Sequence, residues 1–250
     1  MTAGLGWLTA RPVAHRGLHD IGRGIVENMP AAINAAVAGR FNIEVDLQLT
    51  RDGEAVVHHD DKLGRLNEGR AALTELTVDE LKAVTFKNTT ERMMTLRDLL
   101  DIVAGRVGLV LEIKSHYDGD RKLVTRTAEV LSSYQGPAVA MSFDPDQLMA
   151  LKDIAPSLPR GIVAERDYSD PYWNKLTAQQ KYDMTALRHA FCTRPNFVAY
   201  AVDDLPAPAP WIARHIFVRP LLTWTVRTVE QRARAGRYAD QMIFEGFRPE

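Results

Sequence analysis

Residues 43–57 read IEVDLQLTRDGEAVV, and this stretch decides the fold class. Apolar and acidic residues alternate within Ile43–Leu47, so a β-strand here places Glu44 and Asp46 on one face and apolar side chains on the other. The pair Asp52-Gly53 and the apolar run after it indicate a hairpin attached to that strand. Burying two carboxylates without compensation is costly, so we expect a cation or a basic partner beside them.

Short β-rich runs alternate with helical runs along the whole chain, which is typical of βα units around a parallel sheet. In a chain of 250 residues this favours an α/β protein with a (β/α)8 TIM barrel, because closing the sheet removes its exposed edges. The alternative is an open, doubly wound sheet. We expect one domain over residues 1–250, with eight barrel strands at Pro12–His15, Ile43–Leu47, Leu109–Lys114, Ala138–Ser142, Gly161–Ala164, Phe197–Val202, Leu221–Val226 and Gln241–Phe244.

Residues that start and stop helices lie between the expected strands. Proline in a first turn, a capping-box pair, an acidic N-cap and a closing glycine are the signals. They occur at Pro30 with Gly39, Thr77 with Glu80, Asp144 with Pro145, and Thr228 with Gly236.

Composition excludes several classes of protein. The 31 basic and 32 acidic side chains nearly cancel, so no overall field attracts nucleic acid. Cys192 is the only cysteine, which excludes an internal disulfide, and we expect it to be a small buried side chain. No apolar run approaches the ~20 residues of a membrane span, and no leader is evident, so we expect a cytoplasmic protein without stable membrane anchoring. Nothing in the sequence predicts an oligomeric state.

The strand expected at Leu109–Lys114 repeats the acidic pattern, since Glu112 and Lys114 share one face. In a barrel these side chains join Glu44 and Asp46 at the carboxyl ends of the strands, where active sites lie. Three carboxylates without cysteine suit one hard divalent cation, Mg²⁺ or Ca²⁺. The alternative is an internal salt-bridge network that uses Lys114 and holds no metal.

The first strand ends in His15, followed by Arg16 and Gly17. The guanidinium of Arg16 suits a phosphate group, and the glycine permits a tight turn. The hairpin ends in His58 and His59, and a histidine there could face His15 across the barrel mouth. Two such histidines could deprotonate the attacking oxygen and protonate the leaving oxygen of a bound phosphodiester. The remaining histidines are expected to be structural; they are His19, His116, His189 and His215.

Taken together, these residues resemble the glycerophosphodiester phosphodiesterase family, which belongs to the phospholipase-C-like TIM-barrel phosphodiesterases. The matching blocks span most of the chain. They are His15-Arg16-Gly17, Glu27-Asn28, Glu44-Val45-Asp46, Thr50-Arg51-Asp52-Gly53, Val56-Val57 with His59-Asp60, Glu112-Ile113-Lys114, Ser142-Phe143-Asp144 and Trp224-Thr225-Val226.

The resemblance implies a role for each matching residue. Glu44, Asp46 and Glu112 are similar to the family's divalent-metal ligands. His15 and His59 are similar to its acid/base pair, Arg16 and Lys114 to its phosphate contacts, and Trp224 to an aromatic residue that faces the substrate. Packing inside the barrel is the alternative for Trp224. In the family this hairpin marks the start of a small insertion, which would lie at about residues 51–90 here, with Leu63–Val84 as the counterpart of the inserted segment.

The sequence departs from the family pattern at two places. The usual Pro-Glu-Asn-Thr reads Val26-Glu27-Asn28-Met29, after a loop lengthened by Gly22–Gly24. The last strand ends in Phe244-Glu245-Gly246 where relatives often carry Thr-Asp. The second departure bears on the alcohol group of the substrate.

The function expected from these residues is metal-dependent hydrolysis of a small-molecule glycerophosphodiester to glycerol 3-phosphate and an alcohol. A related phosphodiesterase acting on lysophospholipids or sugar phosphodiesters is one alternative. Two further alternatives are a Mg²⁺-dependent carbon–carbon lyase barrel and a phosphate-binding barrel that has lost turnover.

Overall fold

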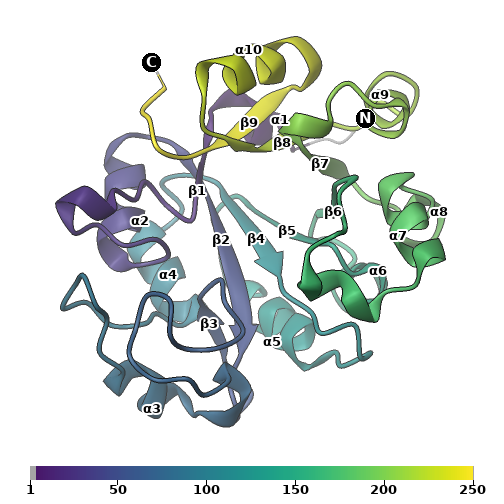
Figure 1. Ribbon diagram of the computed structural model, residues 1–250. Helices are drawn as coiled ribbons and strands as arrows, with labels where there is room; N and C mark the ends of the chain where they lie inside the picture. Colours follow the sequence, from purple (N-terminus) through teal and green to yellow (C-terminus); the bar gives the residue numbers. More distant parts are fainter. Residues whose placement is uncertain (1–3, 250) are drawn as a thin grey trace.

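A closed parallel barrel forms the centre of the computed structural model, which describes residues 4–249 (Figure 1). Neighbouring strands follow the order of the chain, and β1 pairs with both β9 and β2, which closes the ring. The expected TIM barrel is therefore confirmed, with strand ends within two residues of those predicted. Its strands are β1 (Val13–His15), β2 (Asn42–Leu49), β4 (Leu109–Ile113), β5 (Ala138–Ser142), β6 (Arg160–Ala164), β7 (Phe197–Ala201), β8 (Leu221–Val226) and β9 (Gln241–Phe244).

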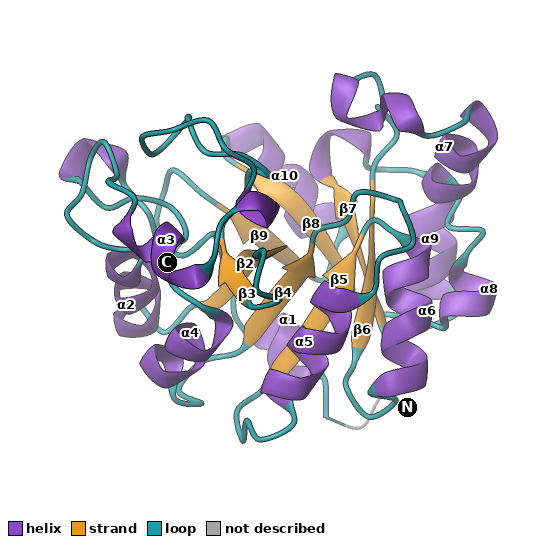
Figure 2. Cartoon of the chain, turned by 90° about the horizontal axis from the view of Figure 1, so that it is seen from below, coloured by secondary structure: helices purple, strands orange, loops and turns teal. Residues whose placement is uncertain are grey.

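Helices surround the barrel (Figure 2). An outer apolar layer lies between them and the strands, and includes Ile33 of α2, Leu99 of α4 and Leu111 of β4. The helices are α1 (Gly6–Ala10), α2 (Pro30–Ala38), α3 (Val78–Ala83), α4 (Leu96–Val103), α5 (Lys122–Leu131), α6 (Pro145–Ile154), α7 (Ala178–Thr185), α8 (Ala190–Thr193), α9 (Pro208–His215) and α10 (Val229–Tyr238). Short 3-10 turns are η1 (Ile21–Arg23), η2 (Leu73–Glu75), η3 (Pro171–Lys175) and η4 (Val202–Asp204).

Most of the expected helix signals are confirmed. Thr77 accepts a hydrogen bond from the backbone of Glu80, and Asp144 caps α6 through the backbone N–H of Asp146. The expected end at Gly236 is wrong, because α10 continues to Tyr238. A glycine inside a helix costs only about 1 kcal/mol. This cost is too small to end α10, because other residues of the helix pack against the barrel.

A second apolar cluster fills the interior of the barrel, where strand residues alternate between the inside and the helices. Val13, Val110 and Phe197 belong to it, together with Leu5 and Leu8 at the amino-terminal end of the chain. His15 and Glu112 lie two residues further along their strands, on the same face as Val13 and Val110. The polar residues therefore form the next interior layer, at the carboxyl ends of the strands.

The expected hairpin is present, since β3 (Ala55–Val57) pairs antiparallel with β2. The chain then forms η2 and α3 at one side of the barrel (Figure 1). Leu63, Leu73 and Phe86 of this segment pack in an apolar cluster with Val26 and Met29 from the first loop. The segment is therefore attached to the loop that follows β1, directly beside the barrel mouth.

Two observations concern the expectations from composition. Cys192 is exposed, so its expected burial is wrong. It lies in the four-residue helix α8, in which Thr193 is buried while Phe191 and Cys192 face the solvent. Within residues 4–249, no helix has both the length and the apolar character needed to cross a bilayer.

Candidate active site

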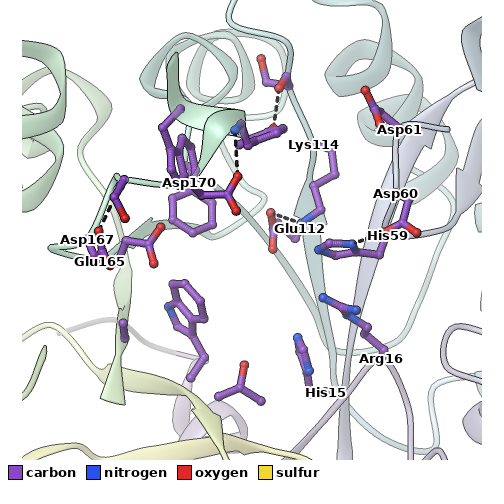
Figure 3. Close-up of a pocket in the computed structure, with 18 of the residues that line it drawn as sticks. His15, Arg16, His59, Asp60, Asp61, Glu112, Lys114, Glu165, Asp167 and Asp170 are labelled. Carbon is purple, nitrogen blue, oxygen red and sulfur yellow. Dashed lines mark hydrogen bonds and ion pairs between the residues drawn. The ribbon is translucent and has the colours of Figure 1, made fainter. Parts of the chain in front are cut away.

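A cavity of about 890 Å³ opens at the carboxyl ends of the barrel strands. His15, Arg16, His59, Glu112 and Lys114 line one side of it (Figure 3). They come from β1, from the hairpin after β2 and from β4. These side chains lie up to about 100 residues apart in the sequence, and the structure brings them together at one cavity.

Glu44, Asp46 and Glu112 form a buried carboxylate cluster beside this cavity. One oxygen of each lies within 4.8 Å of the other two. The register of the parallel pair β2–β4 explains this arrangement, because Asp46 is paired with Glu112. All of the donors are oxygen atoms, so the cluster suits a hard cation such as Mg²⁺ or Ca²⁺.

Lys114 and Arg16 neutralise part of the cluster. Lys114 Nζ lies 2.9 Å from Asp46 Oδ1 and 2.7 Å from Glu112 Oε1. Arg16 Nε lies 3.2 Å from Asp46 Oδ2, and the backbone N–H of Arg16 donates to Glu44 Oε2 at 3.1 Å. These contacts form the salt-bridge network that the sequence offered as an alternative to a metal site.

The second oxygen of Glu44 does not belong to that network. Glu44 Oε1 is buried and has no hydrogen-bond partner among residues 4–249. Burial, and then the charges of Asp46 and Glu112, raise the pKa of Glu44 well above its usual value. Burial would also raise the pKa of Asp46, but Lys114 and Arg16 outweigh it and lower that pKa. A buried, unpartnered carboxylate oxygen beside two other carboxylates is an arrangement that fits a bound divalent cation.

Each of the two candidate catalytic histidines is held by a carboxylate. His15 Nδ1 lies 2.5 Å from Glu245 Oε2, and His59 Nδ1 lies 2.7 Å from Asp60 Oδ1. Since the Nδ1 atoms are engaged, each ring can present Nε2 for proton transfer. His15 Nε2 lies 3.9 Å from Glu44 Oε2, which places it beside the carboxylate cluster.

Burial is the main influence on His15 and lowers its pKa, although the hydrogen bond to Glu245 acts in the opposite direction. The neutral imidazole can donate Nδ1–H to Glu245 and keep the lone pair of Nε2. A neutral ring of this kind can accept a proton from an attacking hydroxyl group.

Arg16 is held in place by the loop that follows β1. Its Nη1 donates to Glu27 Oε1 at 2.7 Å, and its backbone has a φ of +55°. Asn28 in the same loop donates to Asp46 Oδ2 at 3.0 Å. The matched block Glu27-Asn28 therefore orients the phosphate-contact candidate and one carboxylate of the cluster.

Trp224 lines the cavity from the end of β8 and contacts Phe143 edge to face, with ring centroids 5.5 Å apart. This position supports both interpretations drawn from the sequence, because the ring faces the cavity and also packs against another aromatic side chain. Its indole nitrogen is buried and has no hydrogen-bond partner in the part of the chain that the structure describes.

Several contacts at the site were not anticipated from the sequence. Two histidines expected to be structural lie here: His116 lines the cavity, and His19 Nε2 lies 3.4 Å from Glu245 Oε2. Glu245 was noticed only as a departure from the family pattern, and Asp60 only as part of a matching block. Their pairing with histidines depends on barrel closure in the first case and on the hairpin in the second.

The fold and this cavity define a TIM-barrel protein whose mouth combines a buried carboxylate cluster with two carboxylate-held histidines. Such a mouth is the usual place of an active site in this fold. The model of the glycerophosphoryl diester phosphodiesterase family matches residues 15–243. The chain belongs to this family, and is therefore a phosphoric diester hydrolase by its relatives.

Two relatives illustrate the similarity in sequence. A glycerophosphodiester phosphodiesterase of Caldanaerobacter subterraneus subsp. tengcongensis is 30% identical over 69% of this chain and 73% of its own. Glycerophosphodiester phosphodiesterase 1 of Bos taurus is 31% identical over 88% of this chain and 73% of its own.

Solved structures show the same fold at lower identity. A phosphodiesterase of Oleispira antarctica, in complex with the product sn-glycerol 3-phosphate, has a TM-score of 0.75 and 19% identity, covering 93% of this chain and 91% of its own. A glycerophosphodiester phosphodiesterase of Thermotoga maritima has a TM-score of 0.70 and 21% identity, covering 94% of both chains.

Proposed function

We propose that the protein hydrolyses glycerophosphodiesters to glycerol 3-phosphate and an alcohol, with one divalent cation, Mg²⁺ or Ca²⁺. The observation that carries the proposal is the meeting of the buried carboxylate cluster and two carboxylate-held histidines at a single cavity. The relatives named above support the choice of substrate class. The cytoplasmic location expected from the sequence remains a prediction.

Glu44, Asp46 and Glu112 would hold the cation. When bound, it would polarise a phosphoryl oxygen and a substrate hydroxyl and so lower the pKa of that hydroxyl. Lys114 neutralises two of these carboxylates and keeps its charge, because Asp46 and Glu112 outweigh the effect of burial and raise its pKa. Arg16 and Lys114 would contact the phosphate and stabilise the negative charge that develops on its oxygens.

His15 and His59 carry out the proton transfers. In the first step, the glycerol 2-hydroxyl attacks phosphorus and gives its proton to one histidine. The bond from phosphorus to the alcohol oxygen breaks, and the other histidine protonates that oxygen. Water then opens the cyclic phosphate, with the proton transfers reversed, and yields glycerol 3-phosphate. Glu245 and Asp60 hold the two rings in the required orientation.

Chelator-treated protein incubated with glycerophosphocholine and glycerophosphoethanolamine tests the proposal, with and without Mg²⁺ or Ca²⁺. We expect release of glycerol 3-phosphate only with the cation. Folded protein that releases none would contradict the proposal. Release from lysophospholipids or sugar phosphodiesters alone would then favour the related phosphodiesterase.

The variants His15→Ala and His59→Ala test the proton transfers. Each is expected to lower kcat by roughly 10²–10⁴ because general acid–base catalysis contributes that much. The far-UV circular dichroism and melting temperature should stay close to those of the wild type. Turnover near the wild-type rate would remove that histidine from the mechanism.

A further inference from the structure

The half of the cavity that faces the proposed catalytic groups is formed by the ends of β6, β7 and β8. In the closed ring, β6 stands opposite β1 and β7 stands opposite β2. Glu165, Asp167 and Asp170 lie on this far side, while His15, His59 and Lys114 lie on the other (Figure 3). A phosphodiester bound by Arg16 and Lys114 would direct its alcohol group across the cavity toward β6–β8.

Glu165 is a carboxylate without a cationic partner on that far side. Its backbone is fixed: its N–H donates to Tyr168 Oη at 3.2 Å, and its carbonyl accepts from Thr185 Oγ1 at 3.1 Å. Within residues 4–249, no lysine, arginine or histidine nitrogen lies within 4.0 Å of its side-chain oxygens. Burial, and then the charges of Asp204 and Asp167, raise the pKa of Glu165 to about 7. Burial and the neighbouring carboxylates therefore disfavour the charged form of this group.

The other acidic side chains of this wall accept hydrogen bonds, but among residues 4–249 only Asp203 of them pairs with a cationic side chain. Asp203 Oδ1 lies 3.2 Å from Arg234 Nη1, and Asp204 accepts the backbone N–H of Arg166 at 2.6 Å. Asp170 accepts the backbone N–H of Tyr172 at 2.8 Å. Glu165 likewise has no cationic partner in the described chain, and it differs from these residues in its hydrogen bond with the Trp173 side chain, which places its carboxylate next to the aromatic residues of the wall.

Aromatic side chains stand beside Glu165. Phe143, Trp173 and Trp224 all line the cavity, and Phe143 contacts both indoles, with ring centroids 5.0 Å from Trp173 and 5.5 Å from Trp224. The indole nitrogen of Trp224 in this wall is buried and has no hydrogen-bond partner among residues 4–249, so its N–H is available to a bound group. Aromatic faces next to a carboxylate attract alkylammonium groups through both cation–π and charge interactions.

We propose that this wall, with Glu165 as the specificity-determining residue, binds a positively charged amino alcohol as the leaving group of the diester. The inference rests on the proposed function and specifies its substrate class. A primary ammonium group would hydrogen-bond the Glu165 carboxylate, and a quaternary ammonium group would be held by its charge and by the aromatic faces. A negatively charged alcohol would be repelled.

Kinetics with paired substrates test the proposal. Glycerophosphoethanolamine and glycerophosphocholine carry a cation, whereas glycerophosphoglycerol carries a neutral alcohol. For wild type we expect kcat/KM to favour the cationic diesters by about tenfold or more, the usual effect of one partly desolvated charge contact. Glu165→Gln should lower this preference about tenfold, while kcat for glycerophosphoglycerol stays within about twofold. The two cationic substrates show whether primary or quaternary ammonium is preferred.

The matched control is Asp203→Asn, which removes a carboxylate of the same wall that is already paired with Arg234. It should leave the preference unchanged. An equal kcat/KM for all three diesters in wild type, or an unchanged preference in Glu165→Gln, would overturn the proposal.

A binding measurement separates this inference from the proposed function. Choline and its neutral isostere 3,3-dimethylbutan-1-ol are titrated against wild type and Glu165→Gln, with tryptophan fluorescence as the signal. We expect wild type to bind choline at least about fivefold more tightly than the isostere, and Glu165→Gln to lose the difference. If no diester is hydrolysed but this difference is found, the proposed reaction fails and the cation site stands. If diesters are hydrolysed and the difference is absent, the cation site fails alone.

Discussion

Among single residues, Glu245 has a position that its sequence context did not reveal. It contacts His15 and also pairs with Arg227, whose Nε lies 2.5 Å from Glu245 Oε1. Burial would raise the pKa of Glu245, but the hydrogen bonds from His15 and His19 outweigh it and lower that pKa. The carboxylate is thus kept charged and able to hold His15 in one tautomer.

Removing this carboxylate is expected to affect turnover more than substrate binding. Glu245→Ala should lower kcat about 10- to 100-fold with little change in KM, because His15 loses the partner that orients it. Glu245→Gln keeps an acceptor oxygen for His15 Nδ1–H and should recover part of the loss. Steady-state kinetics of both variants give the comparison. A wild-type kcat in Glu245→Ala would show that His15 needs no positioning residue.

The ion pairs of Glu27 lead us to expect that the free energy of unfolding decreases at low pH. Burial would raise its pKa, but hydrogen bonds from Arg65 and the charge of Arg16 outweigh this and lower the pKa from 4.5 to about 2. A carboxyl whose pKa is lower in the folded state stabilises the protein above its unfolded pKa, and this contribution is lost as pH falls from 4.5 toward 2. It amounts to no more than about 3 kcal/mol.

Urea unfolding at pH 6 and pH 3 measures this contribution. The wild type should lose more free energy of unfolding between the two values than Glu27→Gln does, since the amide does not titrate. Other carboxylates affect both proteins alike and cancel in the comparison. An equal loss in the two proteins would show that the Glu27 ion pairs contribute nothing to acid stability.

At the scale of elements, the turn from β1 into α2 is set by a glycine. Gly17 has a φ of +80°, and an added Cβ would lie 2.9 Å from the backbone carbonyl carbon of Ala32 in α2. Close packing of this turn against the helix fixes where Arg16 projects. Gly53, in the hairpin turn, has nearly the same φ of +81°, but no heavy atom of the described residues lies within 4 Å of such a Cβ.

These two glycines form a matched pair. Gly53→Ala should cost about 1 kcal/mol for the positive φ alone. Gly17→Ala should cost about 1–3 kcal/mol more, because α2 must shift, and should also lower activity. Denaturant unfolding and turnover of both variants provide the measurements. Equal losses of stability would mean that the contact with α2 is unimportant.

For the whole molecule, cation binding is linked to stability. A cation that binds only the folded state adds about 2.7 kcal/mol at one hundred times its Kd. For a chain of this length the melting temperature should rise by about 5–10 °C when Mg²⁺ or Ca²⁺ is added to chelator-treated protein. Glu44→Gln should reduce this shift strongly, whereas Glu230→Gln, on the exposed face of α10, should keep it. A wild type without any shift would contradict the assignment of the carboxylate cluster to a cation.

Barrel closure explains the division between what the sequence determined and what the tertiary structure decided. Alternation within single strands is a local property with a period of two residues. It was therefore sufficient to predict the shared face of Glu44 and Asp46, while β-rich runs between helical runs predicted the eight barrel strands and the Asp52-Gly53 turn predicted the hairpin. The motif residues His15, Arg16, His59, Glu112 and Lys114 were likewise recognisable in the sequence, and the structure brings them to one cavity.

Contacts between strands distant in sequence could not be predicted in this way. The pairing of Glu245 with His15 joins residues 230 positions apart and requires β9 to close against β1. Glu165 faces the proposed catalytic groups only because an eight-stranded ring places β6 opposite β1. Which side chains are left without partners depends on burial and on neighbours from other strands. These are properties of the packed barrel, and no segment of the sequence carries them by itself.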